Sequence, residues 1–204
     1  MDSENSGTFP QTDPKEELRK ARRSSAKMLL YLGIVSIVML FAGFTSAYIV
    51  RMQKGNWLVF QLPPVIFLST ALIILSSFTY YLAQRAIRLN KHGFTTLMIF
   101  LTFLLGLGFT RSQFQVWEEL TSQGIFFLGR YANVSGSFFY LIALMHLLHL
   151  FGGLIALLYT GIKAWRGKYS SADFLGISLT GIYWHFLTIL WVYLFLFLYY
   201  FVTG

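Results

Sequence analysis

The sequence has 204 residues, of which 56% are hydrophobic and only 12% are charged, with a net charge of +8 and no cysteine. A soluble domain carries about 25% charged residues, so this composition excludes an ordinary soluble domain and indicates a protein of the lipid bilayer. The missing cysteine excludes a disulfide framework, a thiolate metal site and a cysteine nucleophile. The basic residues lie in short gaps between apolar runs, where they report membrane topology, so nucleic acid is not an expected partner.

The chain begins with a polar segment, 1–27, which is predicted to be cytoplasmic and disordered in its first part. Its second part, Lys15 to Lys27, has the composition of a short helix lying on the anionic membrane surface. The apolar run at 28–50 is longer than the roughly 7–15 apolar residues of a signal peptide. It is therefore predicted to be an uncleaved transmembrane span.

Four more apolar runs follow, so residues 28–204 are predicted to form one transmembrane domain. These runs lack the alternation that marks the strands of a membrane barrel. The fourth would be about 45 Å long as a helix, which exceeds the roughly 30 Å hydrocarbon core and requires tilt or projection. The predicted fold class is all-α, an integral membrane bundle of five transmembrane helices. The expected spans are about 28–50, 63–84, 94–114, 135–165 and 174–202.

The basic residues also predict the orientation of the bundle. Twelve of the 16 Lys and Arg residues fall in the N-terminal segment and in the loops after the second and fourth spans. Cytoplasmic loops of membrane proteins carry an excess of Lys and Arg. The N-terminus is therefore expected in the cytoplasm and the C-terminus outside.

Three histidines, His146, His149 and His185, are the only ionisable candidates deep within the predicted spans. One interpretation is ligation: a haem needs one histidine from each of two helices, and copper or zinc would use all three. The other is a neutral imidazole that hydrogen-bonds across helices. No carboxylate accompanies these histidines as a supporting partner, which favours the second interpretation.

All eight acidic residues lie outside the predicted spans. A proton pump or cation channel needs a path of carboxylates through the membrane, and a serine hydrolase needs an acid beside a histidine. Neither pattern is present. The sequence therefore predicts a membrane bundle that serves as one subunit of a larger complex.

Several stretches carry the pattern of a known family. In the fourth and fifth spans they are Ser135-Gly136-Ser137-Phe138-Phe139, His146-Leu147-Leu148-His149, Phe151-Gly152-Gly153-Leu154-Ile155 and Tyr183-Trp184-His185-Phe186. The first span adds Val38-Met39-Leu40-Phe41-Ala42-Gly43, and Gln115-Val116-Trp117-Glu118 follows the third. Over about residues 28–202 the chain resembles subunit III of haem–copper terminal oxidases, in its short five-helix bacterial form.

The resemblance implies an accessory subunit, in the bacterial inner membrane, of a respiratory complex that reduces O₂ to water and translocates protons. Haem and copper would lie in subunit I, the main partner, and this chain would hold phospholipid and no redox cofactor. Membership of a respiratory supercomplex is a further implied setting. The resemblance implies no catalytic, cofactor or metal residue here. The family-motif positions, implied to be structural, are Gln115, Glu118, His146, His149, Trp184 and His185.

Two other functions stay open at this point. One is a similar accessory subunit of a nitric oxide reductase. The other is a haem b membrane anchor that uses His146 or His149 together with His185.

The chain departs from the family pattern at positions that commonly carry acidic residues. Ile37, Ser178 and Thr188 stand where a glutamate, a glutamate and an aspartate are usual, and Leu147-Leu148 replaces a glycine-bearing pair between the two histidines. These departures indicate a divergent or second subunit III.

Overall fold

A computed structural model describes residues 14–54, 61–128, 134–170 and 174–203. Within these ranges every regular element is a helix, and each of the five helices is long and apolar enough to cross a membrane. The prediction of an all-α membrane bundle with five spans is confirmed. The helices are α1 (Pro14–Met52), α2 (Val65–Arg88), α3 (His92–Ser122), α4 (Val134–Trp165) and α5 (Leu175–Thr203).

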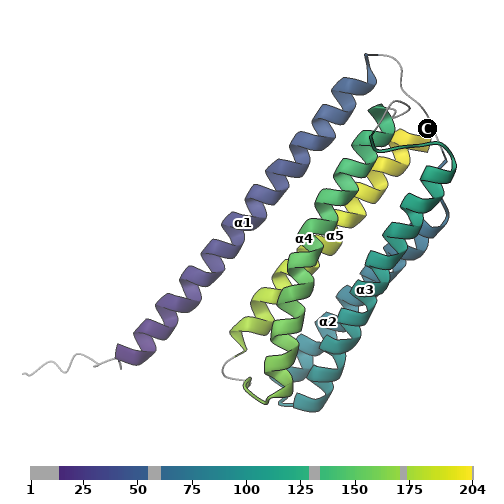
Figure 1. Ribbon diagram of the computed structural model, residues 1–204. Coiled ribbons are helices and arrows are strands. Elements are labelled where there is room, and N and C mark those ends of the chain that lie inside the picture. Colours follow the sequence, from purple (N-terminus) through teal and green to yellow (C-terminus); the bar gives the residue numbers. More distant parts are fainter. Residues whose placement is uncertain (1–13, 55–60, 129–133, 171–173, 204) are drawn as a thin grey trace, which may run out of the picture.

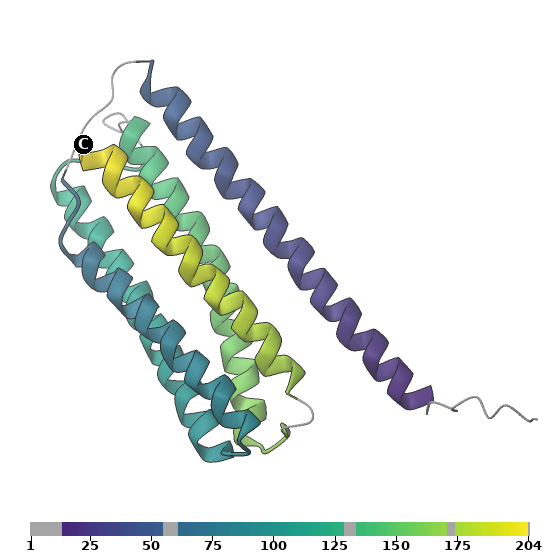
Figure 2. The same cartoon turned by 180° about the vertical axis from the view of Figure 1, so that it is seen from behind.

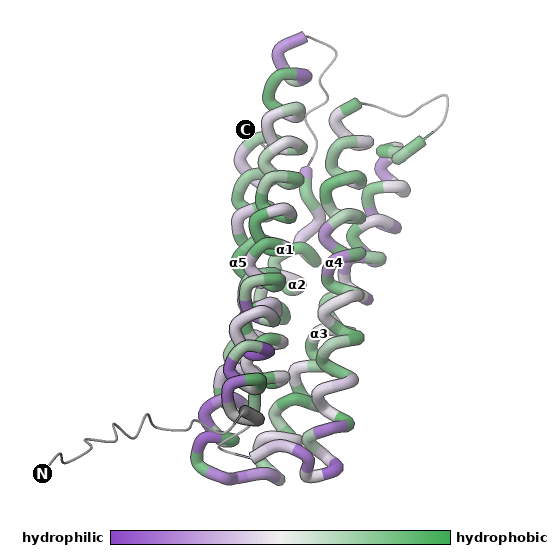
Figure 3. The backbone as a smooth tube through the Cα atoms, turned by 90° about the vertical axis from the view of Figure 1, so that its left-hand side faces the viewer, coloured by the Kyte–Doolittle hydropathy of each residue, from purple (hydrophilic) through white to green (hydrophobic). Residues whose placement is uncertain are grey.

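Helices α2 to α5 form a closed antiparallel bundle (Figure 1). Each of these helices packs on the next one in the chain, and α5 closes the ring by packing on α2. For α2 and α3 this follows from the short connection at 89–91, because helices joined by a few residues become antiparallel neighbours. Hydrophobic residues predominate along the helices, and hydrophilic residues gather most clearly at the end where α2 meets α3 and α4 meets α5 (Figure 3).

Helix α1 is attached to this bundle over only part of its length. Among the described helices it contacts α4 and α5 alone. Of the α1 side chains that the structure describes, the buried ones are Phe41, Thr45 and Tyr48, all in the C-terminal half of the helix. Toward its N-terminus α1 diverges from the other helices (Figure 2), and Leu29 and Met39 are 69% and 70% exposed. Most of the apolar surface of α1 therefore faces lipid or another protein.

The helices extend beyond several of the predicted spans. Residues Lys15 to Lys27 continue into the first span as one unbroken helix, so a separate surface helix is not formed. The reason is local, since no Gly or Pro interrupts the chain between Pro14 and Gly33 and the basic residues and alanines there favour helix. The predicted disorder of residues 1–13 lies outside the described residues.

Helices α2, α3 and α4 each end in the same capping motif. One residue past the C-cap, Asn90, Gly124 and Gly167 have positive φ angles of 55°, 80° and 65°. After α3, the Ile125 amide donates to the Leu120 carbonyl at 3.0 Å, and both side chains are buried. This is the Schellman motif, which satisfies the last free carbonyls of a helix. It places the end of α3 eight residues later than apolarity alone predicts, so the segment Gln115–Glu118 lies within α3, not after it.

Candidate functional site

Polar side chains inside the bundle occur on all the helices and are most frequent on α2 and α3. We call five of those on α2 the α2 hydroxyl row: Ser69, Thr70, Ser76, Ser77 and Thr79. Each lies at a contact with α3 or α5, and all except Ser77 are buried. In lipid, a polar group that lacks a partner is costly, so such residues are most useful where two helices meet.

Two tryptophans of α5 donate to this row. The indole Nε1 of Trp184 donates to Ser76 Oγ at 3.1 Å, and that of Trp191 donates to Thr70 Oγ1 at 3.1 Å. Each hydroxyl donates its own hydrogen to a carbonyl one turn earlier on α2, at Ile73 or Ile66. A lone pair of the hydroxyl oxygen then accepts the hydrogen bond from the indole N–H. The antiparallel contact of α2 and α5 is thus fixed at two places along its length.

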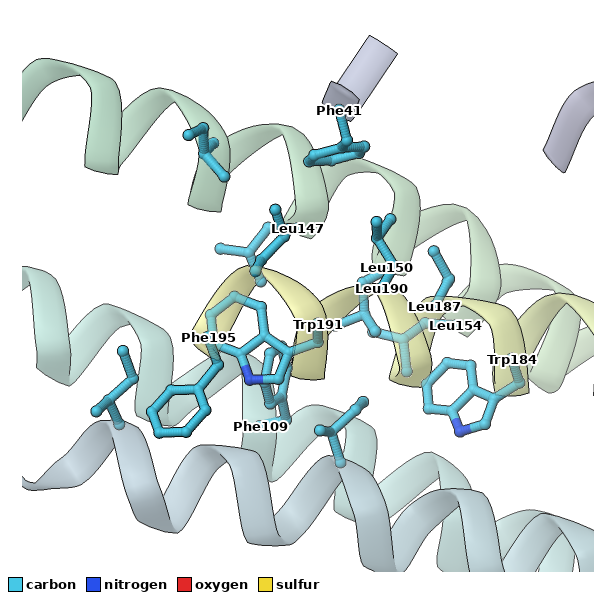
Figure 4. Packing of buried hydrophobic residues seen from close by; sticks show 14 of the residues in the cluster. Phe41, Phe109, Leu147, Leu150, Leu154, Trp184, Leu187, Leu190, Trp191 and Phe195 are labelled. Carbon is cyan, nitrogen blue, oxygen red and sulfur yellow. The ribbon is translucent and has the colours of Figure 1, made fainter. Parts of the chain in front are cut away.

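Trp184 also fills the space between α3 and α4. A Cβ atom added at Gly106 of α3 would lie 2.9 Å from the Trp184 ring, and one added at Gly153 of α4 would lie 3.2 Å from it. Both glycines are therefore needed for the indole to fit, as side chains there would collide with it. Figure 4 shows both indoles projecting from α5 into the core. A single buried side chain thus joins all four helices of the closed bundle.

Trp191 packs against two further rings in the same core. Its ring centroid lies 4.9 Å from that of Phe109 on α3 and 5.0 Å from that of His146 on α4. The Phe109 contact is edge-to-face, with an interplanar angle of 84°. Edge-to-face pairs of this kind add about 0.5–1.5 kcal/mol beyond the area that they bury. Trp184 and Trp191 are therefore the two principal packing residues of the bundle.

The three histidines have different surroundings. His185 Nδ1 and Ser77 Oγ share a hydrogen bond of 2.6 Å, which joins α5 to α2. His149 Nδ1 donates to the Met145 carbonyl at 2.7 Å, within its own helix. Among the described residues, neither ring nitrogen of His146 has a hydrogen-bond partner. The expectation of hydrogen bonds across helices holds for His185 and is wrong for the other two imidazoles.

The geometry does not favour the interpretation of these histidines as ligands. No group of three His, Cys, Asp or Glu side chains that could hold a metal occurs in the part of the chain that is described. The His146 ring is fully buried, and the rings of Phe41, Phe109 and Trp191 surround it at centroid distances of 5.0–6.5 Å. It is packed as a core side chain.

Gln113, a buried glutamine that joins two helices, is not among the residues that the sequence singled out. Gln113 is fully buried and its Nε2 donates to Ser69 Oγ at 2.9 Å, which ties α3 to α2. Gln115 and Glu118, the family-motif positions, are exposed on the outer face of α3. The signal that identifies Gln113 is its helical phase, since it follows buried Phe109 by four residues and precedes buried Val116 by three.

The three positions that depart from the family pattern have different surroundings. Thr188 is buried and donates to the Trp184 carbonyl at 3.1 Å. Ile37 packs against the apolar core from α1. Ser178 borders a small cavity of about 130 Å³ together with Arg23 and Lys27. Because the Thr188 hydroxyl already donates a hydrogen bond within its own helix, it needs no acidic side chain as an acceptor.

Comparison with known proteins gives a consistent result. The family model described as cytochrome c oxidase subunit III matches residues 17–203. A probable cytochrome c oxidase subunit 3 of Mycobacterium tuberculosis is 32% identical over 174 residues, which cover 81% of this chain and 82% of that protein. A similar protein of Nocardia farcinica is 28% identical, with 93% of both chains covered. A cytochrome bo(3) ubiquinol oxidase subunit 3 of Pseudomonas aeruginosa is 29% identical, with 79% and 78% covered. The chain belongs to the cytochrome c oxidase subunit III family.

Proposed function

We propose that this chain is the accessory subunit III of a bacterial respiratory terminal oxidase. It contributes a membrane-embedded packing surface to the complex and carries neither haem nor copper. Oxygen reduction and the coupled proton translocation take place in the partner subunits, with subunit I as the main contact. The family match over nearly the whole chain is the observation that carries this proposal.

The use of polar groups in the core supports an accessory role. Most of the buried hydroxyls, the two core indoles and one imidazole are engaged in hydrogen bonds within or between helices. The eight acidic residues all lie outside the sequence stretches predicted to cross the membrane. The core is thus organised to hold helices together, whereas a catalytic centre needs polar groups that face a substrate or cofactor.

Co-purification tests this function. We expect the affinity-tagged chain, solubilised from its native membranes in mild detergent, to bring down a haem–copper catalytic subunit and its absorption spectrum. The chain expressed alone is expected to show no Soret band, since its histidines are packed or hydrogen-bonded. Recovery without any haem–copper subunit would contradict the proposal. A Soret band from the isolated chain that His185→Ala removes would instead establish a haem anchor.

The proposed orientation places the N-terminus in the cytoplasm of a bacterium, with α1 running outward. The excess of Lys and Arg at the end formed by the α2–α3 and α4–α5 connections supports this orientation. Because the chain has no native cysteine, single cysteines give an unambiguous test. We expect a membrane-impermeant thiol reagent to label Gln53→Cys and Ser122→Cys in intact cells, and Ser24→Cys only after permeabilisation. The reverse labelling would show that the bundle is inserted the other way round.

A further inference from the structure

One ring nitrogen of His185 is open to the outside of the bundle. Its Nδ1 lies 2.6 Å from Ser77 Oγ, across the contact of α5 with α2. The side chain is half-buried, and its Nε2 is neither enclosed by the protein nor hydrogen-bonded within the part of the chain that is described. Figure 2 shows α2 and α5 side by side on the near side of the bundle. The second nitrogen of His185 is therefore accessible to a molecule that contacts this side.

The hydrogen bond to Ser77 determines which nitrogen of the imidazole carries the hydrogen. The other four hydroxyls of the α2 hydroxyl row donate to backbone carbonyls of their own helix at 2.7–2.9 Å. Among the described residues Ser77 has no such carbonyl partner, so its hydrogen points to His185 Nδ1. A neutral imidazole that accepts at Nδ1 carries its hydrogen on Nε2. His185 thus presents an N–H donor on the outside of the bundle.

This donor lies near the middle of the membrane. His185 is ten residues from the start of α5 and Ser77 is eleven residues from the end of α2, and these two helix ends lie at the same end of the bundle. The corresponding rises are about 15 Å and 17 Å, which are half of the roughly 30 Å hydrocarbon core. At that depth there is no water to accept a hydrogen bond. An acceptor for the Nε2 hydrogen must therefore come from another protein.

The surface around this donor is largely apolar and exposed. On α2, Ile74 and Tyr81 lie on the same side of the helix as Ser77 and are 49% and 52% exposed. On α5, Ile189 follows His185 by one turn and is 69% exposed. We call the five residues Ile74, Ser77, Tyr81, His185 and Ile189 the α2–α5 face. Such a surface suits a transmembrane helix, because packing supplies the contact area and one hydrogen bond sets the depth.

We propose that the α2–α5 face is the docking surface for a transmembrane helix of a partner subunit. This helix carries a hydroxyl or amide oxygen at the middle of the membrane, and that oxygen accepts a hydrogen bond from His185 Nε2. The imidazole then joins three helices, since its Nδ1 already holds α2. The inference deepens the proposed function, on which it rests for the existence of a partner subunit.

Lipid and a second copy of this chain are the competing occupants of the α2–α5 face. The acyl chains of a lipid have no acceptor at mid-membrane depth, so they would leave the Nε2 hydrogen unpaired. Two copies related by a twofold axis along the membrane normal would bring His185 against its own counterpart, which places one donor against another. A different chain with an acceptor at this depth is the occupant that satisfies the donor.

Photocrosslinking in native membranes that contain the full complex tests the surface. The crosslinking residue p-benzoylphenylalanine replaces Ile189 in one sample and Ile74 in another, and the products are identified by mass spectrometry. We expect both positions to crosslink to the same membrane protein. Leu104 is the matched control, because it is 47% exposed on α3, a helix that does not pack on α5. No crosslink to that protein is expected from Leu104.

Two substitutions of His185 separate the outward donor from the hydrogen bond to Ser77. Asparagine places its polar atoms near Nδ1 and loses the outward donor, whereas glutamine places an amide N–H near Nε2. His185→Asn is therefore expected to weaken the association with the crosslinked partner by about 3- to 20-fold, the range of hydrogen bonds between membrane helices. His185→Gln should retain the association, as should Ser77→Ala, which removes only the inward bond. The dissociation constant of the complex in mixed micelles measures these changes.

Two results would overturn the proposal: crosslinks from Ile189 and Ile74 to lipid or to a second copy of this chain alone, or equal weakening by His185→Asn and His185→Gln. If a haem–copper subunit still co-purified in the first case, the docking surface would be wrong and the proposed function would stand. A crosslinked partner that belongs to no oxidase, with the difference between the two variants preserved, would leave the surface standing and contradict the proposed function.

Discussion

Trp184→Ala is expected to lower the free energy of unfolding of the bundle by about 3–5 kcal/mol, the usual cost of truncating a buried aromatic side chain. The loss is large because the indole is fully buried, donates to Ser76 and fills the space left by Gly106 and Gly153. Its removal leaves a cavity at the meeting point of four helices. Reversible unfolding in mixed detergent micelles, followed by far-UV circular dichroism, measures the change.

Two companion variants divide this loss into its parts. Trp184→Phe keeps most of the packing and removes the indole donor, so it should cost about 0.6–1.7 kcal/mol, as hydrogen bonds between membrane helices do. Trp165→Ala removes the same side chain from a position that is 78% exposed and should change stability by less than about 0.5 kcal/mol. Equal losses for Trp184→Ala and Trp165→Ala would contradict the role assigned to Trp184.

Gly106→Ile is expected to destabilise the bundle by about 1–3 kcal/mol or more, because it overpacks a core that has no spare volume. The new Cβ alone would lie 2.9 Å from both Leu154 Cδ2 and the Trp184 ring. The backbone of α3 must then move away from α4 and α5. The same unfolding assay measures the effect, and loss of the Trp184 indole environment is followed by tryptophan fluorescence.

The matched control is Gly33→Ile on α1. No atom lies within 4 Å of a Cβ added there, and isoleucine favours helix over glycine. This substitution should leave the free energy of unfolding unchanged or raise it slightly. If Gly106→Ile behaved like Gly33→Ile, the close approach of α3 to Trp184 would be wrong.

Hydropathy was sufficient to predict the number and type of the elements, because a span needs about 20 apolar residues and few sequences supply them by chance. It was insufficient for the ends of α1, α2 and α3, which extend beyond the predicted spans. The C-termini of α2, α3 and α4 are set by Asn90, Gly124 and Gly167, whose left-handed conformation ends a helix whatever the polarity of the preceding residues. In particular, α3 continues well past its last strongly apolar residues, until Gly124 ends it.

The core contacts were predictable only in part, because they depend on how each helix is rotated about its axis. His185 and His146 look equivalent in the sequence, yet one meets Ser77 and the other is enclosed by aromatic rings. Gly106, Gly153 and Trp184 belong to three different helices, and nothing local to any of them indicates that they touch. If one helix were rotated about its axis by the angle between successive residues, a different set of side chains would meet in the core.

The partial attachment of α1 has a consequence for biosynthesis. This helix leaves the ribosome before the other four, yet its buried residues Phe41, Thr45 and Tyr48 find their contacts on α4 and α5, which are made after α2 and α3. At roughly 5–20 residues per second, α1 spends several seconds in the membrane before its partners exist. The α2–α3 hairpin, by contrast, can pair as soon as it is inserted. The first helix of this chain is therefore among the last to dock, and the order of folding differs from the order of synthesis.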